Sequence, residues 1–306
     1  MICIYISDEK IKLIEGDARG NRIIVQRFYD ISTKAGSLES GAIKDTVVFT
    51  QALQDCMQAT NMKAGKACYV LDNSRIVFRE MIVPDVPDAK LKKVIQSELF
   101  SESKSQNTTL DYIVLEKFKD EKKISKLRIM VTYINNEIID NLSVSAVELG
   151  LTPVALDIAP NTMSKLISLY NSNAADRKLL SKTFVLLDFK DTFISIYVFD
   201  GYKTQFTKSS VLYVSDPEHP DLDYLASEMS TQLNSTIRYY QSRNPDKTVE
   251  AVYVTGNALV LDQIMQALAD SVNLMISHLP LPSFVKGMEL IDYNAFTCAL
   301  GTFIRR

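Results

Sequence analysis

The feature that most constrains this chain is a pair of similar segments about half a chain apart. Residues 2–16 contain an apolar strand, a polar turn and an alternating return strand, and residues 185–201 repeat that order. Alternation of apolar and polar residues around a tight polar turn predicts a β-hairpin. Because the same unit opens both halves of the 306-residue chain, the sequence predicts two related lobes.

Composition narrows the class of protein. The chain is 46% hydrophobic and 23% charged, which is ordinary for a globular protein. Its net charge of −3 and the absence of a Lys/Arg cluster argue against nucleic acid as a partner. The N-terminus opens on a predicted strand, and no apolar run reaches the length of a membrane span. We therefore expect a cytoplasmic protein that does not insert into the membrane itself.

Cysteine and histidine offer little material for a metal or catalytic centre. The cysteines are widely spaced and lie in apolar patterns, so we expect buried, reduced thiols: Cys3, Cys56, Cys68 and Cys298. The chain has two histidines, His219 and His278. A site built on histidine is therefore not expected.

The first half of the chain contains a block with a separate order of predicted strands and helices. Strand, helix and strand patterns at residues 22–29, 46–59 and 67–71 continue the opening hairpin. Next comes a β-α-β-β-α pattern, with strands at 75–83, 110–118 and 127–134 and helices at 88–99 and 136–149, interrupted by a polar strip at 101–109. We interpret this block as an insert in the first lobe.

The remaining elements complete a second lobe. A strand at 151–157 and a helix at 159–170 precede a polar segment, 171–182, that we interpret as a linker. After the second hairpin, the pattern predicts strands at 203–208, 251–255 and 272–276, helices at 221–243, 259–269 and 292–304, and a loop at 215–220.

The order of these segments is similar to that of a known family. The stretches "SRIVFREMIVPDVPDAKLKKVIQSEL", "LRIMVTYINNEIIDNLSVSAVELGLTPVALDIAPNTMSKLI", "VLLDFKDTFISIYVFDG", "STIRYYQSRN", "VYVTGN" and "CALGTFIRR" resemble the PilM family of type IV pilus assembly proteins over almost the whole chain. The related FtsA proteins end in a linker and an amphipathic membrane helix, whereas this chain ends at Arg305-Arg306. PilM is therefore the preferred resemblance.

This resemblance implies an α/β, actin-like (ribonuclease H-like, duplicated) fold of two lobes with a β-α-β-β-α insert of the PilM/FtsA type. The implied division is 1–73 and 157–180 for lobe one, 74–156 for the insert, 181–289 for lobe two, and 290–306 for a C-terminal helix returning to lobe one.

The resemblance also implies a function. PilM proteins are cytoplasmic scaffolds of the pilus assembly platform at the inner membrane, and they bind the cytoplasmic tail of a PilN-like membrane protein in a groove between the first lobe and the insert. Other platform proteins and self-association are further implied contacts. Candidate groove residues are Ile76, Phe78, Leu91 and Ile95. The same apolar stripe also suits simple core packing, and the sequence leaves both interpretations open.

Compared with the family pattern, the nucleotide-binding turns are degenerate. Tyr5 stands where the first carboxylate is expected, Ser7 replaces a glycine, and Asp8-Glu9 place negative charge near the phosphates. In the second turn Asp188 is retained but Lys190 replaces the glycine, and Asp191 follows. The implied cleft residues are Ser7, Lys10, Lys12, Asp188, Lys190, Thr192, Gln232, Gly256 and Asn257.

Two interpretations of this cleft remain. Lys10, Lys12 and Lys190 could replace the lost amide contacts to phosphate, with Asp188 as the Mg²⁺ ligand of bound Mg-ATP. Alternatively the site has decayed, and the turns are ordinary hairpin chemistry. Because all three turns depart from the pattern together, we favour decay and expect no cofactor.

The leading hypothesis is therefore a non-catalytic scaffold with a degenerate cleft. The alternative is an ATP-binding switch whose nucleotide state changes partner affinity. A sugar or acid kinase on the same fold is a third hypothesis, but no carboxylate is placed to act as its base.

Overall fold

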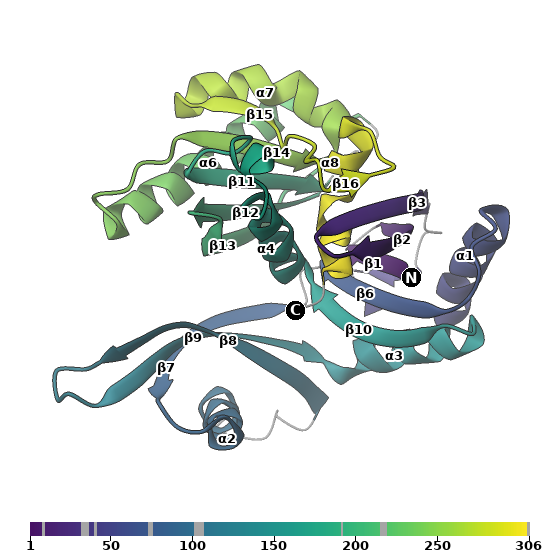
Figure 1. Ribbon diagram of the computed structural model, residues 1–306, viewed down its shortest axis with the longest axis horizontal. Coiled ribbons are helices and arrows are strands. Elements are labelled where there is room, and N and C mark those ends of the chain that lie inside the picture. Colours follow the sequence, from purple (N-terminus) through teal and green to yellow (C-terminus); the bar gives the residue numbers. More distant parts are fainter. Residues whose placement is uncertain are drawn as a thin grey trace.

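The computed structural model describes residues 1–7, 10–31, 37–39, 42–72, 76–100, 107–190, 192–214 and 219–304, and two lobes and an insert are evident (Figure 1). Asp8, Glu9, Asp191, the terminal Arg305-Arg306, and parts of the predicted polar strip (101–106) and loop (215–218) lie outside these ranges. None of the helices in these ranges combines the length and apolar character that a membrane span needs.

Lobe one is built on a six-stranded sheet in the order β10-β6-β1-β2-β3-β16. Its strands are β1 (Ile2–Ser7), β2 (Ile11–Arg19), β3 (Arg22–Ile31), β6 (Lys66–Asp72), β10 (Thr152–Ile158) and β16 (Val285–Lys286). A small pair, β4 (Leu38–Glu39) and β5 (Ala42–Ile43), and the helices α1 (Thr46–Ala59) and α3 (Asn136–Glu148) complete the lobe.

Lobe two is built on a five-stranded sheet in the order β13-β12-β11-β14-β15. Its strands are β11 (Thr183–Lys190), β12 (Phe193–Asp200), β13 (Lys203–Val211), β14 (Ala251–Gly256) and β15 (Met275–His278), covered by α6 (Leu222–Arg243) and α7 (Ala258–Val272). The remaining helices are α4 (Ala159–Tyr170), α5 (Ala174–Arg177) and α8 (Leu290–Leu300), which a 3₁₀ turn follows at Gly301–Phe303.

The two sheets repeat one topology, which confirms the predicted duplication. β1 pairs antiparallel with β2 and parallel with β6, and β11 pairs antiparallel with β12 and parallel with β14. Every residue of β1 is buried because both faces of the sheet are covered. Cys3 and Tyr5 join the core around α4 and α8, whereas Ile2, Ile4 and Ile6 join the core under α1 and α3.

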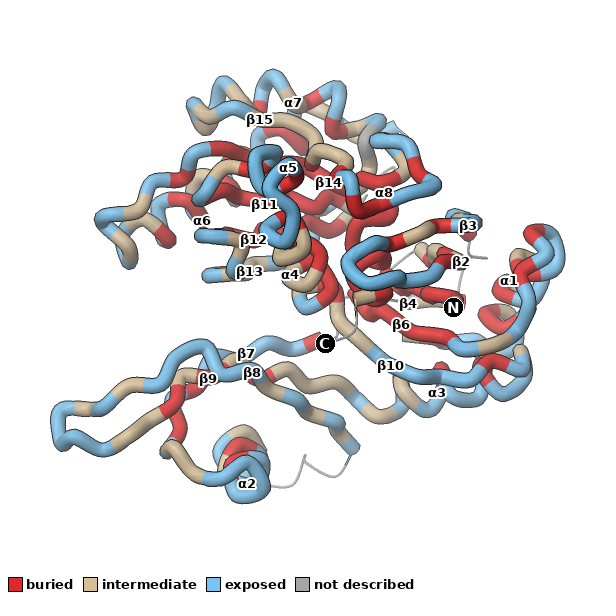
Figure 2. Tube along the Cα trace, viewed as in Figure 1, coloured by how far each residue is buried: buried red, intermediate tan, exposed pale blue. Residues whose placement is uncertain are grey.

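The helices α4 and α8 lie between the lobes and join them. One hydrophobic cluster combines residues of the first sheet (Tyr5), the second sheet (Phe184), α4 (Met163) and α8 (Leu300). Figure 2 shows that buried residues gather in the two lobe sheets and α8, while the insert is largely exposed. The two lobes therefore share part of one hydrophobic core.

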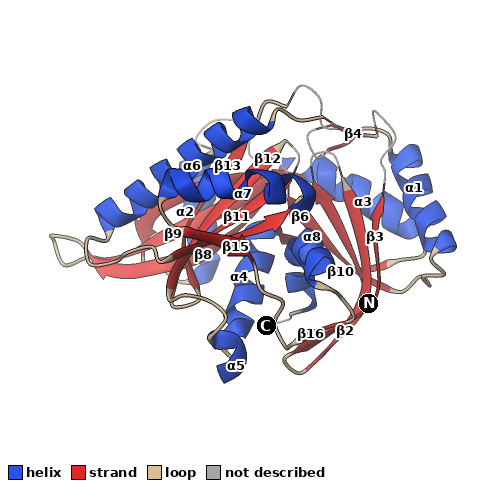
Figure 3. Cartoon of the chain, turned by 90° about the horizontal axis from the view of Figure 1, so that it is seen from above, coloured by secondary structure: helices blue, strands red, loops and turns tan. Residues whose placement is uncertain are grey.

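The insert has its own sheet and its own small core. Its elements are β7 (Val77–Pro84), α2 (Asp88–Leu99), β8 (Thr108–Lys119) and β9 (Ser125–Asn135), with the strand order β7-β9-β8. Side chains from the strands and α2 form a separate cluster: Met81, Val83, Leu91, Ile95, Leu127, Ile129 and Val131. Figure 3 shows the same sheet from above, extending away from the first lobe.

The structure differs from the predicted division at two places. The closing helix of the β-α-β-β-α order, α3, is present, but Ile138, Leu142 and Ala146 pack into the core of lobe one. β10 likewise pairs with β6 of lobe one, so residues 136–156 do not belong to the insert. β16, assigned to lobe two from sequence, pairs with β3 of lobe one. Strands this short leave no periodicity to detect.

Candidate functional site

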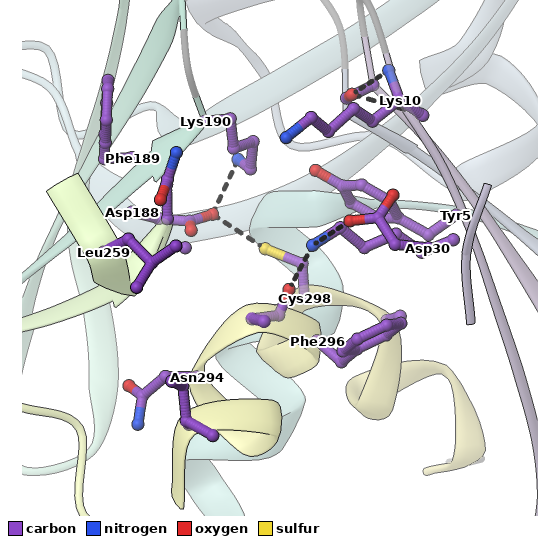
Figure 4. A pocket seen from close by; sticks show the side chains of 17 residues that line it. Tyr5, Lys10, Asp30, Asp188, Phe189, Lys190, Leu259, Asn294, Phe296 and Cys298 are labelled. Carbon is purple, nitrogen blue, oxygen red and sulfur yellow. Dashed lines mark hydrogen bonds and ion pairs between the residues drawn. The ribbon is translucent and has the colours of Figure 1, made fainter. Parts of the chain in front are cut away.

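Residues that flank the two hairpin turns line a cavity of about 360 Å³ between the lobes (Figure 4). Seven of the nine predicted cleft residues line it: Ser7, Lys10, Lys12, Asp188, Lys190, Gly256 and Asn257. The other two are placed elsewhere. The Thr192 carbonyl accepts a hydrogen bond from the Leu212 N–H within lobe two, and Gln232 on α6 donates to Glu228.

An ammonium group lies between two carboxylates at the edge of this cavity. Lys190 at the end of β11 contacts Asp188 at 2.6 Å and also pairs with Asp72 at the end of β6. The side chains of Lys190, Asp72 and Asp188 are only 13%, 5% and 4% exposed. Because β6 belongs to lobe one and β11 to lobe two, this cluster joins the lobes.

Three further side chains orient the carboxylates. Tyr5 donates its hydroxyl to Asp72 Oδ2 at 2.8 Å, and Thr255 donates to Asp188 Oδ1 at 3.1 Å. The thiol of Cys298 on α8 donates to Asp188 Oδ2 at 3.0 Å. Tyr5 stands where the family pattern has a carboxylate. In this structure its hydroxyl instead holds the neighbouring carboxylate of Asp72 by a hydrogen bond.

Sequence reasoning missed Asp72, Thr255 and Cys298. Asp72 lies beside Ser7 because β6 runs parallel to β1, and Thr255 lies beside Asp188 because β14 runs parallel to β11. The available signal was a polar residue at the end of each of these apolar strands, since parallel strand ends meet at one edge of a sheet.

The charged groups in the cluster shift one another's pKa values. Burial raises the pKa of Asp72 more than Lys190 lowers it. Burial also acts against ionised Asp188, but Lys190 and the hydrogen bond from Cys298 outweigh it, so that pKa lies below its ordinary value. Burial likewise disfavours the charged Lys190, yet Asp188 and Asp72 hold its pKa well above the usual range. Lys190 is therefore charged at neutral pH.

The thiol of Cys298 remains protonated in this setting. Burial, and then the adjacent Asp188 carboxylate, raise its pKa well above the ordinary value. A protonated thiol can donate a hydrogen bond but is a poor nucleophile. Cys298 therefore supports Asp188 and does not act as a reactive cysteine.

Lys12 contacts α8 and Asp30. Its ammonium donates to the carbonyl of Ala295 at 2.8 Å and lies 3.6 Å from Asp30. It also lies 4.8 Å from the centre of the Phe296 ring. These contacts join the first hairpin to α8. Lys10 extends over the cavity from the hairpin turn, where its backbone N–H donates to Ser7 Oγ at 2.9 Å (Figure 4).

The retained glycine of the third turn has a local explanation. Gly256 has a φ of +105°, and a Cβ there would lie 1.9 Å from the carbonyl oxygen of Phe189. Asn257 donates its backbone N–H to the same oxygen at 2.9 Å, and its side chain accepts from Val260 N–H at the start of α7. Both residues are thus explained by the β14–α7 turn without a ligand.

Asp72, Asp188 and Cys298 are the described residues whose ligand atoms gather closely enough, within 4.8 Å of one another, to hold a metal ion. The Lys190 ammonium already lies between the two carboxylates and neutralises part of their charge. A divalent cation would have to displace it. With Lys190 in place, these residues do not fit the magnesium ion of a bound nucleotide.

Three of the four candidate groove residues lie inside the protein. Leu91 and Ile95 of α2 are 2% and 0% exposed in the insert core, and Ile76 is 7% exposed in the core of lobe one. Their apolar stripes serve core packing, so their assignment to a partner groove is corrected. Phe78 is 38% exposed and remains available.

Duplicated hairpins around an interlobe cavity, with an insert in lobe one, define the actin-like ATPase fold. No protein-family model and no curated protein sequence matches the chain. Its structure is similar to that of the PilM–PilN type IV pilus biogenesis complex, with a TM-score of 0.80 and 16% identity over 99% of this chain and 97% of that one. The resemblance to PilM is thus confirmed at the level of fold.

Two further structures share the fold at greater distance. The cytoplasmic domain of EpsL, an inner-membrane component of the type II secretion system of Vibrio cholerae, has a TM-score of 0.50 and 10% identity over 98% of this chain and 94% of that one. The ethanolamine utilization protein EutJ from Carboxydothermus hydrogenoformans has a TM-score of 0.51 and 11% identity over 99% of this chain and 88% of that one.

Proposed function

We propose that this chain is a PilM-like scaffold of a type IV pilus assembly platform that binds the cytoplasmic tail of a PilN-like inner-membrane protein. The observation that supports this most strongly is the full-length structural match to the PilM–PilN complex, which includes the insert. The EpsL cytoplasmic domain, from another inner-membrane machine, has the same overall fold.

The open face of the insert sheet is the proposed docking surface. Met81 and Val83 of β7 face α2, so the alternating residues Phe78 and Ile82 lie on the opposite face. In Figure 1, α2 lies on the side of this sheet away from the lobes. Ile134 of β9 packs against the core of lobe one. The open face therefore begins at the junction between the insert and lobe one.

This face offers apolar side chains around a small charged group. Ile82 is 56% exposed, and Ile113 of β8, which is paired with Met130 of β9, is 60% exposed. Arg128 of β9 lies 3.2 Å from both Glu80 and Glu116 on the same face. A short, extended tail with apolar side chains suits such a surface, because alternate side chains of a strand-like peptide point to one side.

The chemistry of the cleft supports a scaffold and not an enzyme. Asp72 and Asp188 both form ion pairs with Lys190, and the protonated thiol of Cys298 donates a hydrogen bond to Asp188. We therefore propose that the protein has no nucleotide cofactor and no hydrolytic activity. Its place would be the cytoplasmic face of the inner membrane, reached through the partner protein.

Isothermal titration calorimetry with a synthetic peptide tests the partner. The peptide is the N-terminal cytoplasmic tail of the PilN-like protein from the same genome. We expect saturable binding that Ile82→Asp and Ile113→Asp each weaken at least about tenfold, or about 1.4 kcal/mol, because a charge placed at the centre of an apolar interface must lose its water on binding.

Val47→Asp is the matched control, since Val47 is 75% exposed on α1, away from the insert (Figure 1). Its peptide affinity should equal that of the unmodified protein. Absence of saturable binding to the unmodified protein would remove the proposed function. Equal losses in all three variants would remove the proposed surface.

A further inference from the structure

We propose that Lys190 provides, from within the chain, the positive charge that a divalent cation would bring to the interlobe site, so that closure of the two lobes needs no nucleotide. This inference is independent of any partner. It concerns what holds the two lobes together beside the cavity, and it is based on the Lys190, Asp72 and Asp188 cluster, hereafter the interlobe ion cluster.

The cluster spans the boundary between the lobes. Asp72 ends β6 beside Ser7 of the first hairpin, and Lys190 ends β11 of the second hairpin. The ammonium contacts both carboxylates, one from each lobe. Separating the lobes would break the Asp72 contact and expose an ion pair that is otherwise buried.

The two carboxylates require a cation at this position. Both side chains are at most 5% exposed, and like charges at short distance in a buried site destabilise each other. Tyr5 and Cys298 donate to the same carboxylate oxygens that Lys190 contacts, and Thr255 donates to the other oxygen of Asp188, but none of the three brings a charge. Lys190 supplies the compensating charge, and its ammonium lies 5.8 Å from the centre of the Phe193 ring.

Removing the ammonium should therefore convert the cluster into a metal-responsive site. Lys190→Ala leaves the ligand atoms of the two carboxylates and the Cys298 thiol within 4.8 Å of one another, without the ammonium between the carboxylates. We expect its melting temperature to fall by about 10 °C, because an uncompensated buried charge is costly. Adding Mn²⁺ should restore several degrees in a saturable manner. The unmodified protein should show no shift with Mn²⁺ or with Mg-ATP.

Lys165→Ala is the matched control. Lys165 of α4 pairs with Asp157 of β10 at 2.7 Å, and among the residues that the structure describes no second carboxylate pairs with this ammonium. This variant should lose stability without any response to Mn²⁺. The comparison separates loss of one ion pair from loss of an interlobe cation.

A double variant keeps the test decisive if Lys190→Ala does not fold. Replacing Asp72 by Asn in the Lys190→Ala background removes one of the two negative charges that repel each other. Folded protein should therefore be recovered. Failure of this recovery would overturn the proposal, because Lys190 would then act through packing of its stem. Stabilisation of the unmodified protein by Mg-ATP, or a Lys190→Ala variant as stable as the unmodified protein, would also overturn it.

Discussion

The two carboxylates of the interlobe ion cluster should respond differently to neutralisation. Asp188→Asn removes the negative charge that faces Lys190 and one of the two oxygens that accept from Thr255 and Cys298, in a site that is 4% exposed. Asp72→Asn removes a charge whose burial is not fully compensated, since the pKa of Asp72 lies above its ordinary value. The asparagine amide oxygen can still accept from Tyr5. We expect Asp188→Asn to cost much more stability.

The magnitudes follow from the contacts. Removing one partner of a buried, hydrogen-bonded ion pair costs about 3–5 kcal/mol, and we expect about 3 kcal/mol for Asp188→Asn because Asp72 still pairs with Lys190. For Asp72→Asn the relief of charge burial offsets the lost ion pair, which leaves about 1 kcal/mol or less. The difference corresponds to roughly 4–8 °C in melting temperature.

Urea denaturation at pH 7, followed by circular dichroism, measures both free energies of unfolding. Similar m-values in the two variants would show that the transitions are comparable. A loss in Asp72→Asn that equals or exceeds the loss in Asp188→Asn would refute the expectation that Asp188 contributes more to stability than Asp72.

Three further predictions follow from the described contacts. Gly256→Ala places a Cβ against the Phe189 carbonyl at positive φ and should cost at least about 2 kcal/mol, whereas Gly65→Ala, where a Cβ meets nothing within 4 Å, should cost far less in the same thermal melt. Ile95→Ala, at a fully buried site, should destabilise the insert by about 3 kcal/mol, seen as faster hydrogen exchange in β7–β9 with unchanged exchange in β11 and β14. Because the pKa of Asp72 is raised above 3.8, its contribution to stability is present below that pH and is lost as the pH rises through the raised value. The free energy of unfolding of the unmodified protein should therefore fall relative to Asp72→Asn as the pH rises from about 4, and a difference that does not change with pH would contradict this.

The duplicated topology was predictable because each hairpin has a sequence pattern that extends over only a few neighbouring residues. Apolar alternation around the turns at residues 8–10 and 190–192 is a short-range signal. The insert was also detectable, since its strands and α2 show clear periodicity. The packing of α3 on lobe one was not, because an amphipathic helix does not state which neighbour covers its apolar face.

The site was predictable only in part, for a related reason. The hairpin turns identified Lys190 and Asp188, but Asp72 and Cys298 come from elements 67 or more residues away in sequence from their hydrogen-bonding partners. Only the folded structure reveals that Lys190 is turned toward carboxylates and not toward a phosphate. The prediction that Leu91 and Ile95 line a partner groove was wrong for a different reason. Residues of a core and residues of a groove show the same apolar pattern in sequence.

The most direct measurement is the affinity of the PilN-like tail peptide with and without Mg-ATP, by calorimetry on the unmodified protein. A scaffold whose lobes are closed by Lys190 should bind the peptide saturably, with dissociation constants that agree within about twofold in the two conditions. No saturable binding, or an affinity that Mg-ATP changes by about fivefold or more, would contradict it.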